Sequence, residues 1–454
     1  MPVEILDKPG PNSLPLRLVS KADFEQVELS ATHRAWAQAS GFAGELGRLL
    51  LLPGAAGEAK GALFGLGAGD GGAMAAGSIA RALPEGDWHF EVSPADPRLA
   101  MLAAVLGGYA FTRYGTKATR AIRLAVPEGA DAAAIRRTAQ GVFLARDLIN
   151  TPTNDMGPDD LEQAARKLAA DHGAVVTVVA GEDLLTRNFP MIHAVGRASA
   201  QAPRLVEFVW GRPDARKVTL VGKGVCFDTG GLDIKPASSM LLMKKDMGGA
   251  ANVLGLASML MAANADIRLR VLLPVVENAI AGNAFRPGDV LPSRKGPTVE
   301  IGNTDAEGRL ILADALALAD EEAPDLLVDM ATLTGAARVA LGPDLPPFYT
   351  PDDSFASELM SASAKVEDPL WRMPLWKPYA AKLASKVADI NNVTSDGFAG
   401  SITAALFLQR FVEKARTWAH FDIFGWNPAD RPWGPVGGEA QAIRALEAVI
   451  LGQE

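Results

Sequence analysis

The chain has 454 residues, of which 48% are hydrophobic and 21% are charged. This is an ordinary balance for a globular protein, and the length suggests two domains. A net charge of −9 argues against a broad nucleic-acid-binding surface. The single cysteine, Cys226, excludes an intrachain disulfide and fits a reducing cytoplasm. Because the first ten residues lack a signal-peptide pattern and no apolar run could cross a bilayer, we expect a cytoplasmic protein without a membrane segment.

Short apolar runs alternate with helical patterns over residues 1–130 and predict a small α/β domain. Asp96 followed by Pro97 is typical of a helix start, with a capping residue before proline at the first helical position. We expect this helix to reach Tyr114. The other elements that we expect in this domain are strands at 46–52, 62–67, 88–92 and 120–126 and a helix at 72–83.

A glycine-rich turn in this domain, Gly67-Ala-Gly-Asp-Gly-Gly72, fits the dinucleotide-binding pattern G-x-G-x-x-G. It follows an expected strand and opens an expected helix, and Glu91 lies at a suitable distance downstream. This would make the protein a nucleotide-dependent oxidoreductase. In a chain with 45 glycines, a tight turn with close helix–strand packing is the competing interpretation.

Residues 131–150 form one long helical pattern that Asn150-Thr-Pro-Thr-Asn154 interrupts, and we expect them to link the first domain to a catalytic domain over 151–454. The pattern there predicts a central mixed, mostly parallel sheet flanked by helices. The expected helices lie at 158–171, 248–263, 403–412 and 440–451, and the expected strands at 175–179, 204–210, 218–221, 267–276, 326–330 and 418–423.

The most informative stretch is 299–312, where a short apolar run, a turn and a helical pattern follow one another. Asp305, Glu307 and Arg309 occupy alternate positions in the turn. Two carboxylates in one turn can converge on a hard cation. The alternative is a capped helix with acids in its first turn.

Further charged residues follow other expected strands and turns. Because parallel strands end at the same edge of a sheet, these side chains can share one site. Four buried carboxylates would repel one another unless two divalent cations neutralised them, and Mn²⁺, Mg²⁺ or Zn²⁺ would suit such ligands. None of the five histidines forms an H-E-x-x-H motif. For each residue alone, a solvated charge or a cap is the alternative. The residues concerned are Lys223, Asp228, Lys235, Asp246, Asp305 and Glu307.

The string Asn303-Thr-Asp-Ala-Glu-Gly-Arg-Leu310 resembles the signature of the cytosolic leucine aminopeptidases. The resemblance covers most of the chain after Ala145, whereas the first 125 residues match weakly. It implies a homo-hexameric two-metal exopeptidase that removes leucine or another apolar residue from peptides with a free N-terminus. The other matching segments are 150–152, 221–236, 244–251, 276–278, 286–289, 331–335 and 402–405.

The resemblance also implies a role for each charged residue. Lys235 would stabilise the oxyanion, and Arg309 would hold a bicarbonate that acts as the general base. The cofactors would be two Mn²⁺ or Zn²⁺ ions, with Mg²⁺ as a further candidate, and the bicarbonate. The tighter metal would take Lys223, Asp228, Asp246 and Glu307, and the more exchangeable metal would take Asp228, Asp305 and Glu307.

The pocket for the first substrate side chain is implied in the same way. Met243, Thr332 and Gly335 would line it, and Leu333 would contribute backbone contacts, although Met243 is also a plausible core methionine. Residues 421–433 depart from the family pattern through their aromatics and prolines. A non-catalytic protein that retains the fold is a further alternative, and the intact acidic set argues against it.

Overall fold

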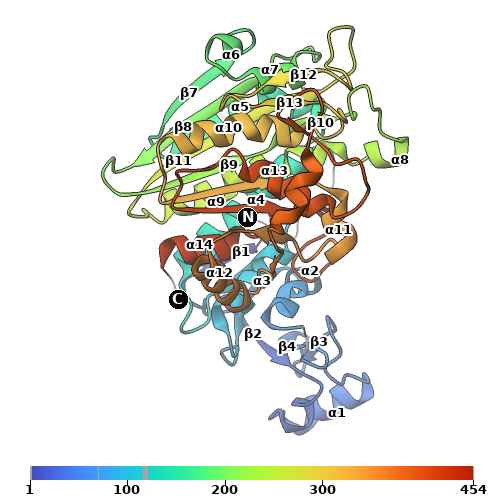
Figure 1. Ribbon diagram of the computed structural model, residues 1–454. Helices are drawn as coiled ribbons and strands as arrows, with labels where there is room; N and C mark the ends of the chain where they lie inside the picture. Colours follow the sequence, from blue (N-terminus) through green and yellow to red (C-terminus); the bar gives the residue numbers. More distant parts are fainter. Residues whose placement is uncertain (1–2, 70, 116–120, 453–454) are drawn as a thin grey trace. The chain divides into compact units, whose positions relative to one another are not determined.

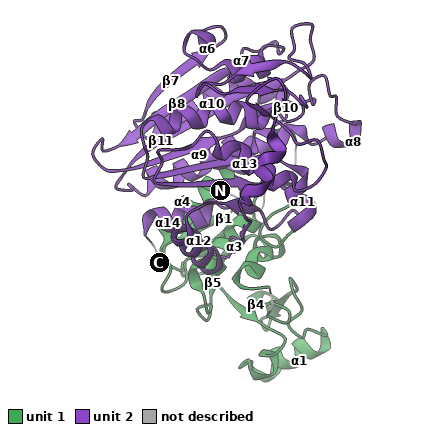
Figure 2. Cartoon of the chain, in the orientation of Figure 1, with its two compact units in different colours: residues 1–143, 427–436 green, residues 144–426, 437–454 purple. Residues whose placement is uncertain are grey.

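The computed structural model describes residues 3–69, 71–115 and 121–452. The chain forms two compact units (Figure 2): Met1–Phe143 with Asn427–Val436, and Leu144–Trp426 with Gly437–Glu454. The segment Asn427–Val436 therefore groups with the first unit, whereas the sequence analysis assigned it to the catalytic domain. Across the described ranges, no helix is long and apolar enough to cross a membrane.

The first unit contains a six-stranded sheet within its described residues, in the order β1-β6-β5-β2-β4-β3. The pairs are parallel except for the edge pair of β3 with β4. The first two strands of the chain, β1 and β2, were not predicted, because each is short and interrupted by a charged residue. The strands are β1 (Val3–Leu6), β2 (Leu14–Val19), β3 (Leu49–Pro53), β4 (Ala59–Gly65), β5 (Gly86–Phe90) and β6 (Ile122–Ala125).

The helices of the first unit are shorter than predicted. Helix α3 (Pro97–Gly107) begins where Asp96 caps it, since Asp96 Oδ1 accepts a hydrogen bond of 2.8 Å from Leu99 N, but it ends well before Tyr114. The expected helix at 72–83 is a 3₁₀ turn, η2 (Ala73–Ser78), followed by α2 (Ile79–Ala82). The remaining elements are η1 (Phe24–Gln26) and α1 (Ala31–Ala39), which were not predicted, and the first part of α4 (Ala132–Asn150).

The glycines of the candidate dinucleotide motif take backbone conformations that other residues rarely adopt. Gly67, Gly69 and Gly72 have φ values of +72°, +86° and +60°. Asp70 of this motif lies outside the described residues, as does Arg120 of the strand expected at 120–126. A sharp turn is thus sufficient to explain why glycine occupies these three positions.

The second unit is built on a nine-stranded sheet in its described part, ordered β16-β15-β18-β14-β9-β11-β8-β7, with β10 also paired to β11 (Figure 1). Strands β18, β14, β9 and β11 are mutually parallel, and β10 is parallel to β11. This confirms the predicted mixed, mostly parallel sheet. The strands are β7 (Val175–Ala180), β8 (Arg204–Gly211), β9 (Arg216–Gly222), β10 (Gly224–Asp228), β11 (Ile267–Asn278), β14 (Leu326–Ala331), β15 (Pro347–Tyr349), β16 (Trp371–Arg372) and β18 (Thr417–Asp422).

Helices cover both faces of this sheet. Helix α9 (Gly248–Ala262) contacts β9 and β14 and also packs against α14 (Ile443–Leu451). Helix α10 (Gly308–Glu321) contacts the same two strands and packs against α7 (Pro190–Gly196) and α13 (Gly400–Gln409). Strand β11, flanked by both layers, is buried along nearly its whole length, as its branched residues predicted.

The remaining elements of the second unit connect these layers. They include a small sheet in the order β12-β13-β17. Their bounds are α5 (Pro158–Asp171), α6 (Asp183–Thr186), α8 (Ala237–Met240), η4 (Met243–Met247), β12 (Val290–Pro292), β13 (Thr298–Glu300), α11 (Gly335–Leu341), α12 (Asp353–Lys365), η5 (Lys377–Leu383) and β17 (Ile390–Asn391).

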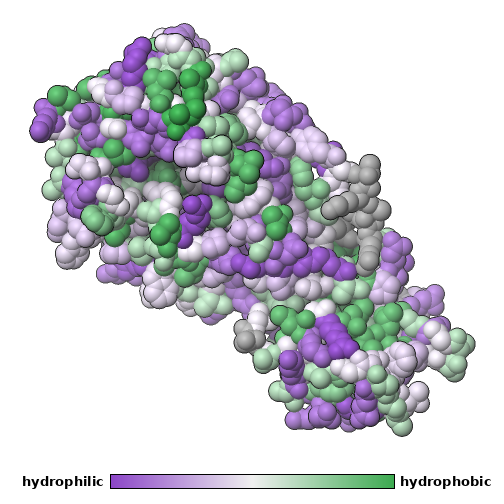
Figure 3. Space-filling model, turned by 90° about the vertical axis from the view of Figure 1, so that its right-hand side faces the viewer, coloured by the Kyte–Doolittle hydropathy of each residue, from purple (hydrophilic) through white to green (hydrophobic). Residues whose placement is uncertain are grey.

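Large apolar side chains are mostly buried, but several lie on the surface of the second unit. Leu241, Val339 and Phe398 are among the most exposed. On the face drawn in Figure 3, hydrophobic residues form several small patches among hydrophilic ones. Scattered patches of this kind are normal for a protein surface and do not indicate a binding site.

Candidate functional site

The site lies where parallel strands of the second unit reach their carboxyl ends. Lys223 follows β9, Asp228 ends β10, Thr332 follows β14 and Asp422 ends β18. Since these strands run in the same direction, their ends meet at one edge of the sheet, as the sequence analysis expected. Side chains that are far apart in the sequence therefore face a common space.

Close backbone packing holds Lys223 in place. Its N–H donates to Met330 O (3.0 Å) and its carbonyl oxygen accepts from Ala250 N (2.9 Å). A Cβ atom on Gly308 would lie 2.5 Å from Lys223 Cε, and one on Gly249 would lie 2.1 Å from Met330 O. Glycine is therefore required at position 249 for the strand to pack at this point, and a side chain at position 308 would displace the Lys223 amine.

The turn after Asp228 returns the chain to the site. Asp228 Oδ1 accepts hydrogen bonds from Gly230 N (2.9 Å) and Asn278 Nδ2 (2.8 Å). Gly230 and Gly231 both have positive φ values, +87° and +65°, which makes the reversal possible. Lys235 N then donates to Thr229 O (2.9 Å), so the Lys235 side chain points back toward the strand end.

The loop before α10 is tied to the same turn. Thr304 Oγ1 donates to Gly230 O (2.7 Å), and Thr304 N donates to Asp233 Oδ2 (2.8 Å). Asp305 N donates to Asn303 Oδ1 (2.7 Å), which fixes the start of the acidic turn. These bonds bring the loop that carries Asp305 and Glu307 next to Asp228.

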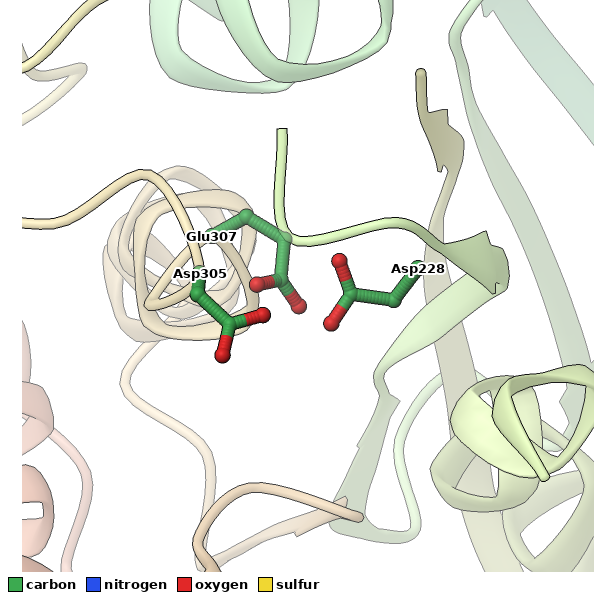
Figure 4. A group of neighbouring side chains, drawn as sticks. All are labelled: Asp228, Asp305 and Glu307. Carbon is green, nitrogen blue, oxygen red and sulfur yellow. The ribbon is translucent and has the colours of Figure 1, made fainter. Parts of the chain in front are cut away.

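Three carboxylates converge at this point (Figure 4). Asp228, Asp305 and Glu307 each offer an oxygen atom, and these oxygens all lie within 4.8 Å of one another. Asp246, on η4, lies on the other side of Lys223, whose Nζ is 2.7 Å from Asp246 Oδ2 and 3.0 Å from Glu307 Oε1. The structure therefore brings together the four acids that the sequence analysis singled out.

Glu307 is buried with fewer partners than a carboxylate normally has. It is 1% exposed, its Oε1 pairs only with the Lys223 ammonium at 3.0 Å, and neither of its oxygens accepts a hydrogen bond of good geometry from the described residues. Buried polar atoms are usually hydrogen-bonded, and an unpaired carboxylate oxygen is costly. Oxygens that point at a shared space and lack donors are the donor set expected around hard or borderline divalent cations, so the residues fit two such ions.

The two lysines pair with different acids. Lys223 is buried, and its Nζ also donates to Thr332 O (2.9 Å). Lys235 is more accessible, and its Nζ lies 2.8 Å from Asp228 Oδ2 and also contacts Asp305 Oδ1. One lysine thus stands among the acids, and the other stands at the edge that faces the cavity.

Burial and mutual repulsion shift the pKa values of the acids upward. Burial and the neighbouring Asp228 charge raise the pKa of Glu307 to about 8, and the same two causes raise the pKa of Asp305 to about 6. Burial alone would also raise the pKa of Asp246, but the charges of Lys223 and Lys245 and the hydrogen bond from Lys223 together outweigh burial and lower that pKa. Strongly shifted pKa values in a cavity are typical of functional sites.

The lysine pKa values move in the opposite sense from what burial alone would cause. Burial disfavours the charged form of Lys223, but the charges of Asp246, Glu307 and Asp228 outweigh it and raise the pKa above its ordinary value. Burial opposes the charge of Lys235 as well, and Asp228 and Glu307 raise its pKa in the same way. Without cations, both lysines are therefore protonated at neutral pH.

Arg309 lies at the start of α10, close to the acids. Its Nη1 donates to Asn392 O (2.5 Å), whereas its Nε is buried and has no partner among the described residues. Burial lowers its pKa to about 10, so it keeps its charge at neutral pH. The guanidinium thus retains a free donor.

A cavity of about 490 Å³ opens over this cluster. The four residues expected to bind the substrate, Met243, Thr332, Leu333 and Gly335, all line it, together with the metal-ligand candidates, Lys235 and Arg309. Lys245, Arg338 and Asp422 are among the lining residues that were not predicted. Phe424 also lines the cavity and belongs to the segment 421–433 that the sequence analysis set apart.

A mixed α/β domain whose parallel strand ends carry buried acids and lysines belongs to the class of metal-dependent hydrolases. Comparison with known proteins makes this specific. Residues 143–446 match the catalytic domain of the cytosol aminopeptidase family, and residues 14–127 match the N-terminal domain of the same aminopeptidases. The chain belongs to the cytosol aminopeptidase family, a family of peptidases, which confirms the resemblance found in the sequence.

Individual relatives agree with this assignment. A probable cytosol aminopeptidase of Syntrophotalea carbinolica is 43% identical over 315 residues, which are 68% of this chain and 63% of that protein. One from a Synechococcus species is 38% identical over 377 residues, covering 79% and 77% of the two chains. The alignment to the first of these thus spans less than two thirds of the relative's length.

Solved structures match over nearly the whole chain. The cytosol aminopeptidase from Coxiella burnetii has a TM-score of 0.93 and 45% identity, with 99% of both chains covered. The bottromycin maturation enzyme BotP in complex with Mn has a TM-score of 0.87 and 34% identity, with 97% of this chain and 99% of that chain covered. The predicted fold class, including the smaller N-terminal domain, is therefore confirmed.

Proposed function

We propose that the protein is a metal-dependent aminopeptidase that hydrolyses the first residue from peptides with a free N-terminus. The observation that carries this proposal is the convergence of the buried Glu307 with Asp228 and Asp305, with only lysine ammonium groups to offset the charge and no backbone donor to Glu307 among the described residues. Family membership supports the reaction class. The neighbour named as a complex with Mn supports a divalent cation as cofactor, and Mn²⁺ and Zn²⁺ both suit these ligands.

The proposed ligand sets are those that the family resemblance implies. One cation would be held by Lys223, Asp228, Asp246 and Glu307, and a more exchangeable one by Asp228, Asp305 and Glu307. When bound, two such cations supply Lewis-acid activation of water and of the scissile carbonyl. Lys223 can be a ligand only as a neutral amine. In the absence of metal the neighbouring acids keep it protonated, so this proton must leave when a cation binds.

Two basic residues around the acids would have separate roles in the reaction. Lys235, held at the cavity edge as a cation, would stabilise the negative charge that develops on the scissile carbonyl oxygen. Arg309 has a free buried Nε–H and a planar fork, which suit a bicarbonate ion acting as general base. The acids themselves are needed as ligands, which is why a separate base is required.

The first substrate side chain would lie against Met243, Thr332 and Gly335, with Leu333 providing backbone contacts. The apolar walls that Met243 and Phe424 supply support acceptance of leucine and similar residues. By analogy with the family, we further propose a homo-hexamer in the cytoplasm.

Removal and return of metal test the proposal. We expect a chelator to abolish hydrolysis of leucine p-nitroanilide, and Mn²⁺ or Zn²⁺ to restore it after the chelator is removed. Peptides with an acetylated N-terminus should resist cleavage, because the reaction requires the free amine. Full activity in protein shown by elemental analysis to lack metal would refute the proposal.

A further inference from the structure

Besides Arg309, two cations line the cavity without a carboxylate partner among the described residues. Lys245, on η4, and Arg338, on α11, both lie over the ring of Phe424, with Lys245 Nζ 4.8 Å and Arg338 Cζ 5.1 Å from the ring centroid. Within the described part of the chain, neither forms an ion pair with an acidic side chain. Lys245 is 6% exposed, whereas Arg338 is exposed on the cavity wall.

The nearby acids are already committed to other groups. Asp246 pairs with Lys223 and accepts from Thr332 Oγ1 (2.8 Å). Asp422 accepts from Leu333 N (3.1 Å), Thr334 N (3.0 Å), Thr334 Oγ1 (2.6 Å) and Ser401 Oγ (2.9 Å). The lysine and arginine donors therefore remain available to something that enters the cavity.

A purely structural role does not account for this arrangement. Burying an ammonium group without a carboxylate partner is costly, and a cation–π contact returns only part of that cost. A pair of cations that share one aromatic wall and keep free N–H donors is a recognition site for an anion.

Given the proposed aminopeptidase function, we propose that Lys245 and Arg338 bind the side-chain carboxylate of an N-terminal glutamate or aspartate, which the enzyme removes in addition to apolar residues. Lys245 lies two positions after Met243, and Arg338 three positions after Gly335, so both extend the wall of the first side-chain pocket. Phe424 would contact the apolar part of the substrate side chain. Hydrogen bonds from the two cations would replace those that the carboxylate makes with water.

The test compares p-nitroanilides of glutamate, aspartate and leucine, which carry no other carboxylate, on the Mn²⁺-loaded enzyme. We expect kcat/KM for glutamate to lie within about tenfold of that for leucine. The Arg338→Met and Lys245→Met substitutions should each lower kcat/KM for glutamate by about 10- to 100-fold, the range for losing a charge-assisted hydrogen bond. Activity on leucine should change by less than about threefold, since uncharged stems keep their contacts.

Two variants control for local disturbance. Lys244→Met removes the neighbouring lysine, which lies over Trp426 and donates to Asn150 O (2.7 Å) and does not line the cavity; it should leave the glutamate-to-leucine ratio unchanged. Arg338→Lys keeps the charge and should retain most of that ratio. Because Arg338 is exposed, its variants should fold normally.

The outcomes separate this inference from the proposed function. Leucine hydrolysis with a glutamate-to-leucine ratio that neither Arg338→Met nor Lys245→Met changes would overturn the inference alone. Loss of all anilide hydrolysis in the metal-loaded wild-type protein would overturn the proposed function and the inference with it. If Arg338→Met slowed only Leu-Glu-amide relative to Leu-Leu-amide, the carboxylate would belong to the second residue, and the inference would be wrong.

Discussion

Buried carboxylates occur in two settings in the second unit, which differ in whether backbone N–H groups donate hydrogen bonds to them. Asp320 connects two segments by accepting hydrogen bonds of 2.8–3.0 Å from the backbone N–H groups of Glu413, Lys414 and Ala415. Asp368 likewise accepts from Arg444 N (2.9 Å) and Ala445 N (3.1 Å). At the proposed metal centre, Glu307 is equally buried, pairs only with the Lys223 ammonium, and accepts no backbone hydrogen bond among the described residues.

The comparison teaches that burial does not distinguish a structural acid from a functional one. Around Asp320, folding supplies donors to both oxygens, so the charge stabilises the folded chain. Around Glu307, folding gathers further acids and leaves oxygens unpaired, which destabilises the metal-free chain. What marks Glu307 is the lack of backbone donors among the described residues, and substitutions of Glu307 and Asp320 should have opposite consequences.

The largest expected effect is on activity at the metal centre. Glu307→Gln should lower kcat/KM for leucine p-nitroanilide by about 1000-fold, or about 4 kcal/mol, because a ligand shared by both proposed cations is lost. The metal-free variant should be as stable as the wild type or more stable, since like-charge repulsion is relieved. Denaturant unfolding of the chelated proteins measures this, and a marked loss of stability would assign Glu307 to the structural group.

A smaller loss of activity is expected from Lys235→Met. This residue contacts two acids but lies at the cavity edge, so its removal should lower kcat by about 100-fold through loss of oxyanion stabilisation. Bound metal, measured by elemental analysis, should stay near wild-type levels. Lys382→Met, which breaks an exposed pair with Asp396, is the matched control and should change kcat by less than twofold.

Asp320→Asn should produce the reverse pattern. The amide cannot accept from all three backbone donors, so we expect the free energy of unfolding to fall by about 2 kcal/mol. Metal content and kcat per folded molecule should not change. Asp389→Asn provides a control, because Asp389 also accepts from a backbone N–H, that of Thr298, but lies on the surface; a loss as large as that of Asp320→Asn would contradict the argument from burial.

The smallest effect is a pH dependence of stability in the chelated protein. The folded chain raises the pKa of Glu307 to about 8 from an ordinary value of 4.5, so the folded state holds a proton that the unfolded state releases. Stability should therefore fall as pH rises from about 4.5 through about 8. Glu307→Gln should reduce this slope, as should saturation with metal. An unchanged slope in the variant would show that other groups determine it.

Much of the second unit could be predicted because its sequence patterns are local and strong. Helix α5 has the predicted bounds, Pro158–Asp171, since proline at its first position and two acids in its first turn mark its start. Helix α14 begins at Ile443, three residues later than predicted, because Ala442 takes a positive φ of +70° just before it. No local sequence pattern predicts a positive φ for an alanine.

The acids of the site were also within reach, because charged residues at strand ends and in a tight turn are conspicuous. The residues of the cavity wall could not be predicted in this way. Lys245 stands between two other charged residues, and Phe424 follows a strand among apolar neighbours, so neither has a sequence pattern of its own. A lysine immediately before a metal-ligand candidate was the available signal. Only the folded chain brings Lys245 and Arg338 over the same ring.

The burial of Lys223 against Gly308 has a consequence for how the proposed cations would be taken up. The ammonium lies 2.7 Å from Asp246 Oδ2 and 3.0 Å from Glu307 Oε1, at the place where a cation would bind. If Lys223 is a ligand, as we propose, a cation that enters has to displace the ammonium proton. We expect uptake to acidify a weakly buffered solution, and enzyme kept at low pH to recover its activity slowly after metal is added.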